Sequence, residues 1–152
     1  MTLKHRGRDW IGLRLSVISN RYTYPLYAAI ERDHGLLRDE AAVIVCLSFG
    51  DGATAQDIVG YTARPKNTIS RAVRKLEAAG VIRRHGDSSD ARASRLYLTD
   101  HGLSLFRRIR VKYVERDENV VGALTASEQR EFDRLLVKIA DASKTWVYLE
   151  ML

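Results

Sequence analysis

The chain has 152 residues, of which 45% are hydrophobic and 29% are charged; these values are ordinary for a folded protein and exclude a disordered chain. The single cysteine, Cys46, excludes a disulfide framework within the chain, which suits a reducing cytosol. No run approaches the roughly 18 apolar residues that a membrane helix needs, so we expect a cytoplasmic protein without a membrane partner.

The first third of the chain predicts two helices. Apolar residues recur at helical spacing from about Arg8 to Asp33, and Gly35 is a suitable stop. Pro25 lies inside this segment and predicts either a kink or a second helix that begins there. A further helix is predicted over about 38–49, because acidic residues occupy its first turn and glycines follow it.

The next segment predicts two short helices joined by a tight connection. Thr54 is a suitable N-cap for a helix over about 55–60. Pro65 suits the first turn of a helix over about 65–79, which Gly80 closes. The second helix has one apolar face, and its other face is basic and polar. This arrangement is typical of a helix-turn-helix.

A basic β-hairpin is predicted directly after these helices. Strands over about 81–85 and 94–98 flank a loop rich in turn residues. Residues 61–95 hold nine Lys or Arg and three Asp or Glu, a net charge of 9 − 3 = +6, whereas the rest of the chain sums to 16 − 16 = 0. We therefore predict a winged helix-turn-helix that places its second helix in the major groove and its wing along the backbone or in the minor groove. The alternative at this point is a solvated basic face without a partner.

Two long helices are predicted at the C-terminal end. Thr99 caps the first, over about 100–121, and a capping box at Thr125–Glu128 starts the second, over about 126–149. Both would exceed ~30 Å. They carry more apolar surface than a small winged core can cover, so we expect a second copy of the chain to cover it, with the two recognition helices about one DNA turn apart. The alternative is a monomer whose helices pack back onto its own winged domain.

The order of these parts resembles the multiple-antibiotic-resistance regulator (MarR) family. The resemblance is carried by TAQDIVGYTARPKNTISRAVRKLEAAGVIRR and DARASRLYLTDHG, and it extends over nearly the whole chain. It implies one mainly α domain with a small β-hairpin wing, spanning residues 1–152. Within it, 1–35 would be an N-terminal dimerisation helix, 36–98 the winged helix-turn-helix, and 99–152 the C-terminal dimerisation helices.

The resemblance also implies a homodimeric transcriptional regulator, usually a repressor, that binds pseudo-palindromic double-stranded DNA. Asp90-Ala91-Arg92 looks like the family's wing signature, which implies that Arg92 enters the minor groove and that Asp90 orients it. Together with the basic pattern, it predicts a DNA-binding set of Arg64, Lys66, Asn67, Thr68, Ser70, Arg71, Arg74, Lys75, Arg92 and Arg95. An activator, or a protein-interaction or RNA-binding module that uses the same basic face, remains the alternative.

A small effector is a further expectation from the resemblance, because family members often bind aromatic or phenolic anions. Trp10, Arg14, Tyr22 and His34 lie in the corresponding part of the chain, although such a stripe is also typical of a core or dimer interface. The four histidines are scattered and no Gly-rich phosphate loop or nucleophile pattern is present. We therefore expect no enzyme activity, no cofactor and no metal site.

Overall fold

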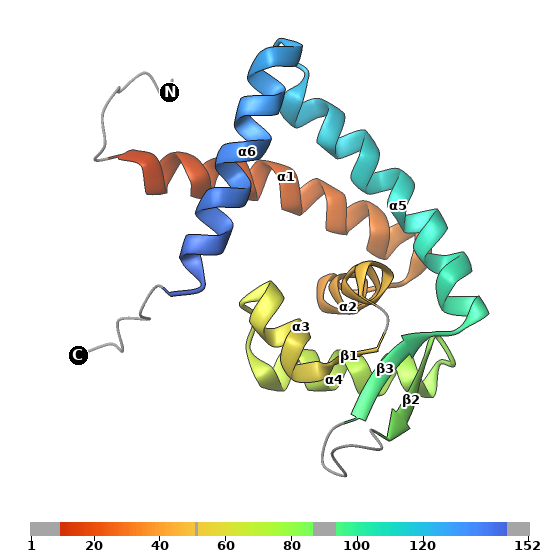
Figure 1. Cartoon of the computed structure of the whole chain (residues 1–152). Coiled ribbons are helices and arrows are strands. Elements are labelled where there is room, and N and C mark those ends of the chain that lie inside the picture. The colour runs from red at the N-terminus through yellow and green to blue at the C-terminus, as the bar shows by residue number, and fades with distance from the viewer. Residues whose placement is uncertain (1–9, 51, 87–93, 146–152) are drawn as a thin grey trace. The chain divides into compact units, whose positions relative to one another are not determined.

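The fold is mainly helical and carries a small antiparallel sheet, as predicted. The computed structural model describes residues 10–50, 52–86 and 94–145. The chain divides into two compact units, Met1–Arg116 and Asp117–Leu152. In chain order the elements are α1 (Ile11–His34), α2 (Arg38–Phe49), β1 (Ala53–Thr54), α3 (Ala55–Thr62), α4 (Lys66–Ala78), β2 (Ile82–Gly86), β3 (Ser94–Leu98), α5 (Asp100–Val121) and α6 (Ala126–Ser143) (Figure 1).

Helix α1 continues through Pro25, so the alternative of a second helix beginning there is wrong. Proline has no N–H to donate to the carbonyl four residues earlier, which here belongs to Arg21. The Arg116 guanidinium of α5 donates to that carbonyl instead, at 2.6 Å. The helix therefore continues past Pro25 with the freed acceptor satisfied, and it ends at Gly35 in the left-handed conformation (φ 66°), as predicted.

The core of the first unit lies where α2, α3 and α4 pack together and against the sheet. Helix α2 has the predicted bounds, whereas α3 runs two residues further than predicted, to Thr62. Pro65 is the N-cap of α4 and not part of its first turn, because its ψ of 135° is extended. Its carbonyl nevertheless accepts the N–H groups of Thr68 and Ile69 at 3.0 and 3.2 Å, so it fixes the start of α4.

The sheet has the strand order β1-β3-β2, and both pairings are antiparallel. Strands β2 and β3 confirm the predicted hairpin, although β2 begins one residue later than predicted. Strand β1 was not predicted, and it pairs Ala53 with Leu96 and Thr54 with Arg95. The sheet thus ties the start of α3 to the second strand of the wing.

The second unit contains the end of α5 and all of α6. The predicted capping box is confirmed, because Thr125 Oγ1 accepts the Glu128 N–H and the Glu128 carboxylate accepts the Thr125 N–H. Helix α6 ends at Ser143, so the prediction that it extends to residue 149 is wrong. Its 18 residues span ~27 Å, which is also shorter than the predicted length of more than ~30 Å. The hydroxyls of Ser143 and Thr145 donate to backbone carbonyls three residues earlier. These side-chain hydrogen bonds compete with the backbone hydrogen bonds that would extend the helix.

Candidate nucleic-acid interface

Helix α4 has two distinct faces. The buried face comprises Ile69, Ala72, Val73 and Leu76, all at most 5% exposed. Among the predicted DNA-binding residues on this helix, Lys66, Asn67, Arg71, Arg74 and Lys75 are exposed, and Thr68 and Ser70 are partly exposed. The apolar residues recur at three- and four-residue spacing, which holds the helix on the core and presents the polar residues to solvent.

Two of the predicted DNA-binding cations form ion pairs with α2. The Lys75 amine lies 2.7 Å from a carboxylate oxygen of Glu40, and Arg64 is paired with Asp39. Glu40 is only 3% exposed, and its other carboxylate oxygen accepts the Leu37 N–H at 3.1 Å. These pairs fix α4 against the start of α2. Sequence reasoning missed Glu40, because an acid in the first turn of a helix is usually explained by the helix dipole.

The described part of the wing places its basic residues on a short hairpin. Arg84 makes a two-pronged ion pair with Glu77 at the end of α4, at 3.2 and 3.3 Å. Arg83 lies over the Tyr97 ring, 5.3 Å from its centroid. Arg95 donates to the Gly52 carbonyl at 3.1 Å. Asp90 and Arg92 lie outside the described residues.

The start of α3 is fixed by the predicted cap. Thr54 Oγ1 accepts the Asp57 N–H at 3.1 Å, and the Asp57 carboxylate accepts both the backbone N–H and the hydroxyl of Thr54 at 2.8 Å. These hydrogen bonds hold the pKa of Asp57 below its usual range. The first helix of the helix-turn-helix is thus anchored where β1 enters it.

The end of α4, the wing and the start of α5 are joined through Thr99. Its hydroxyl donates to the Gly80 carbonyl at 2.7 Å and accepts the Gly102 N–H at 3.1 Å. A Cβ placed on Gly102 would lie 2.1 Å from the Val81 carbonyl oxygen. Only glycine therefore permits this close approach of α5 to the first strand of the wing.

The structure does not gather the predicted ligand residues into one pocket. His34 lines a cavity of about 620 Å³ at the C-terminal end of α1. Arg14 and Tyr22 lie earlier in α1, Trp10 is its N-cap, and none of these three residues lines that cavity. A smaller apolar pocket of about 290 Å³ lies between α2 and α3, and half-buried Cys46 lines it. Burial raises the pKa of the Cys46 thiol, which disfavours the thiolate form.

Within the ranges that the structure describes, no cluster of three or more His, Cys, Asp or Glu side chains is arranged to hold a metal ion. None of the described helices combines the length and the apolar character that crossing a bilayer requires.

Comparison with known proteins places this winged unit in a family. The family model described as MarR family matches residues 34–93. The HTH-type transcriptional repressor Rv2887 of Mycobacterium tuberculosis is 30% identical over 105 residues, which are 69% of this chain and 76% of that protein. The chain belongs to the MarR family. MarR proteins are transcriptional regulators and not enzymes.

Solved MarR structures share the fold of this chain. Rv2887 in complex with p-aminosalicylic acid superposes with a TM-score of 0.69 at 28% identity, covering 85% of this chain and 97% of that one. A MarR transcriptional regulator from Methanosarcina mazei Go1 gives a TM-score of 0.78 at 23% identity, covering 90% of this chain and 97% of that one, and shows the fold alone. The wing, the recognition helix and the flanking helices of this MarR protein thus follow the family architecture.

Proposed function

We propose that this MarR protein is a cytoplasmic homodimeric repressor that binds a pseudo-palindromic operator, with α4 in the major groove and the wing in the minor groove. The observation that carries the proposal is the pair of faces on α4. Its apolar face closes the core, and its exposed face offers an amide and guanidinium groups from Asn67, Arg71 and Arg74. Such groups make the usual contacts to base edges and phosphates.

Uncovered apolar side chains support a dimer. The exposed large hydrophobic residues on α1 and at its start are Trp10, Ile11, Leu13, Leu15, Ile18 and Tyr24, and those on α6 are Leu135, Leu136, Val137 and Ile139. Apolar faces of this kind typically mark a protein interface, and a two-fold dimer is the commonest way to cover them. The whole chain, 1–152, would then act as one dimer-forming domain.

A small aromatic or phenolic effector would relieve repression. The relative Rv2887 has been crystallised with p-aminosalicylic acid, an aromatic carboxylate, and this supports an effector of the same chemical kind. In this chain Arg14 would pair with the carboxylate, because a guanidinium binds that group through two hydrogen bonds. Trp10, Tyr22 and His34 are the neighbouring candidates.

Selection of bound duplexes from sheared genomic DNA, at two salt concentrations, tests the proposal. We expect a recovered palindrome whose half-sites lie about one helical turn apart, bound by a dimer. Recovery of no preferred sequence, with binding lost at the higher salt, would reject operator recognition and leave a non-specific polyanion binder.

The salt dependence of operator binding tests individual residues. Arg71→Ala and Arg92→Ala should each weaken binding and lower the slope of log K against log salt by about one unit, if each removes one phosphate contact. Lys75→Met should leave the slope unchanged, because the Lys75 amine is held by Glu40. Arg130→Ala on α6 serves as the control. A slope that falls for Lys75→Met would return this residue to the DNA-contacting set.

A further inference from the structure

The outer face of the wing hairpin carries a cluster of basic and aromatic side chains. Strands β2 and β3 pair side by side (Figure 1), with Arg83 opposite Tyr97 and His85 opposite Arg95. Side chains alternate between the two faces of a strand, so Arg83 and His85 share one face, roughly 6–7 Å apart along β2. Both are exposed, whereas the buried apolar residues of the hairpin occupy the other face.

Arg83 and His85 also contact each other. A guanidinium nitrogen of Arg83 is hydrogen-bonded to Nε2 of His85. Because a guanidinium can only donate, Nε2 must accept, and the imidazole in this pair is neutral. The Tyr97 ring supports both partners, since the Arg83 guanidinium lies 5.3 Å from its centroid and the His85 ring meets it edge-on with the two centroids 5.5 Å apart. This arrangement persists only while His85 is uncharged.

The charged groups around this pair are cationic. Arg84 points to the opposite face of β2 and is ion-paired with α4. Across the hairpin, Arg95 interacts electrostatically with Asp57 of α3. Among the described residues, no carboxylate contacts Arg83 or His85. An anion from outside the protein therefore meets donors that no acidic side chain of the described chain already neutralises.

We propose that Arg83 and His85 form a proton-linked site for a phosphodiester group of the DNA backbone. Protonation of His85 from solution ends the hydrogen bond from Arg83, because a protonated imidazole has no acceptor, and leaves two cations side by side. A phosphate between them accepts hydrogen bonds from both and relieves their repulsion. Neither residue belongs to the DNA-binding set predicted from the sequence, and the site rests on the proposed DNA binding.

The sign of the pH dependence follows from linkage. The phosphate binds the charged form of His85 more tightly than the neutral form, so DNA binding takes up a proton. The affinity for DNA therefore rises as the pH falls through the range in which histidines ordinarily change charge, about pH 8 to pH 5. The salt dependence becomes steeper in the same direction, by up to about one unit of slope per protomer.

Calorimetric titration of the full chain with a short duplex of unselected sequence, at low salt and about pH 7, tests the site. Backbone contacts need no particular sequence. Repeating the titration in buffers of different ionisation enthalpy counts the protons taken up, and we expect about half a proton or more per protomer. His85→Gln should lose most of this uptake, because an amide accepts from Arg83 but does not protonate. Arg83→Gln should lower the salt slope by about one unit per protomer.

Two matched variants serve as controls. His101→Gln replaces an exposed histidine at the start of α5, and Arg84→Gln replaces the neighbouring arginine that is paired with α4. Both should keep the proton uptake of the parent. Equal uptake in His85→Gln and the parent, or loss of uptake in His101→Gln instead, overturns the proton link. A salt slope that Arg83→Gln leaves unchanged overturns the phosphate contact.

Failure of the proposed function would look different. Proton uptake at His85 on the unselected duplex, without selective binding of any operator, rejects operator recognition and leaves the phosphate site standing. Selective operator binding without proton uptake at His85 overturns the site and leaves the proposed function intact. Absence of binding to any duplex at low salt overturns both.

Discussion

The hydrogen bond between Arg116 and the Arg21 carbonyl predicts a measurable coupling with Pro25. Arg116→Met removes the donor that replaces the missing proline N–H, and we expect it to lower the free energy of unfolding by about 1 kcal/mol. This is below the ~1.5–3 kcal/mol of a typical charged hydrogen bond, because water can reach the carbonyl. The buried Arg116 Nε also has no hydrogen-bond partner in the described structure, so its removal offsets part of the loss.

In a Pro25→Ala background the same substitution should cost less than about 0.5 kcal/mol, since the alanine introduced there has a backbone N–H that reaches the Arg21 carbonyl. Pro25→Ala alone should stabilise the protein by about 1–3 kcal/mol, because a proline inside a helix costs up to ~3 kcal/mol. The assay is urea unfolding followed by far-UV circular dichroism at a fixed protomer concentration. Arg110→Met, an exposed arginine on the same helix, is the control. Equal costs of Arg116→Met in both backgrounds would refute the account of how α1 passes Pro25.

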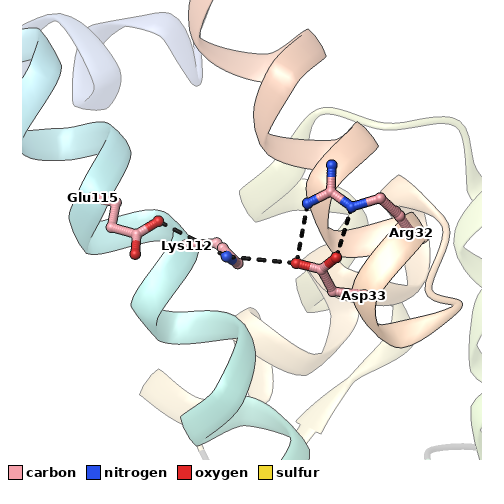
Figure 2. Close-up of polar contacts among 4 residues, drawn as sticks. All are labelled: Arg32, Asp33, Lys112 and Glu115. Atoms are coloured by element: carbon pink, nitrogen blue, oxygen red, sulfur yellow. Dashed lines mark hydrogen bonds and ion pairs between the residues drawn. The ribbon is translucent and has the colours of Figure 1, made fainter.

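Three further changes are expected to alter stability, measured by the same unfolding assay. Thr54→Ala should cost about 1 kcal/mol, because it removes the N-cap of α3; no change would mean that Asp57 holds the helix start alone. Gly102→Ala should lower the free energy of unfolding by at least ~1–3 kcal/mol, because the added methyl group overpacks the contact with Val81. Gly60→Ala should raise the free energy of unfolding by about 0.5–1 kcal/mol, because its methyl group meets open space within a helix. Similar changes in both variants would contradict the close approach of α5 to the wing. The hydrogen bond from Arg32 lowers the pKa of Asp33 in the folded protein below its value of ~4 in the unfolded chain (Figure 2). The contribution of Asp33 to stability is therefore fully present above pH ~4, and it is lost as the pH falls through the folded-state pKa. Asp33→Asn should therefore reduce the loss of stability between about pH 7 and pH 3, and an unchanged loss would exclude Asp33 as a contributor.

Local signals in the sequence were sufficient for most of the helices. The bounds of α2 were predicted from acidic residues in its first turn and the glycines after it, and those of α5 from the Thr99 cap and a following glycine. The Thr54 and Thr125 caps were also recognised from the sequence. The end of α6 was predicted wrongly, since an apolar pattern continues to residue 149 while hydroxyl groups near Ser143 compete for backbone carbonyls. Local patterns thus indicate where a helix can form better than where it stops.

Features that depend on distant parts of the chain could not be predicted. Strand β1 has two residues, too few to show alternation, and exists because β3 pairs with it. The burial of Glu40 depends on Lys75, which is distant in sequence and reaches it from α4. The exposed basic residues of α4 were predicted as a set, but periodicity alone could not show that exposed Lys75 is also ion-paired with Glu40 of α2. The cavity at the end of α1 draws on several elements, and only His34 and Lys75 among its lining residues were predicted to bind a ligand or DNA.

The pairing of β1 with β3 also has a consequence for synthesis of the protein. Ala53 cannot find its partner Leu96 until the intervening residues have left the ribosome. Helices α3 and α4 form hydrogen bonds within themselves and can form during this delay. The sheet, in contrast, must close a loop of roughly forty residues, which costs entropy before any contact compensates it. A nascent chain stalled before residue 96 would therefore carry α3 without the strand pairing that ties the start of this helix to the wing. Such a chain would expose the edge of β2 to other chains until translation resumed.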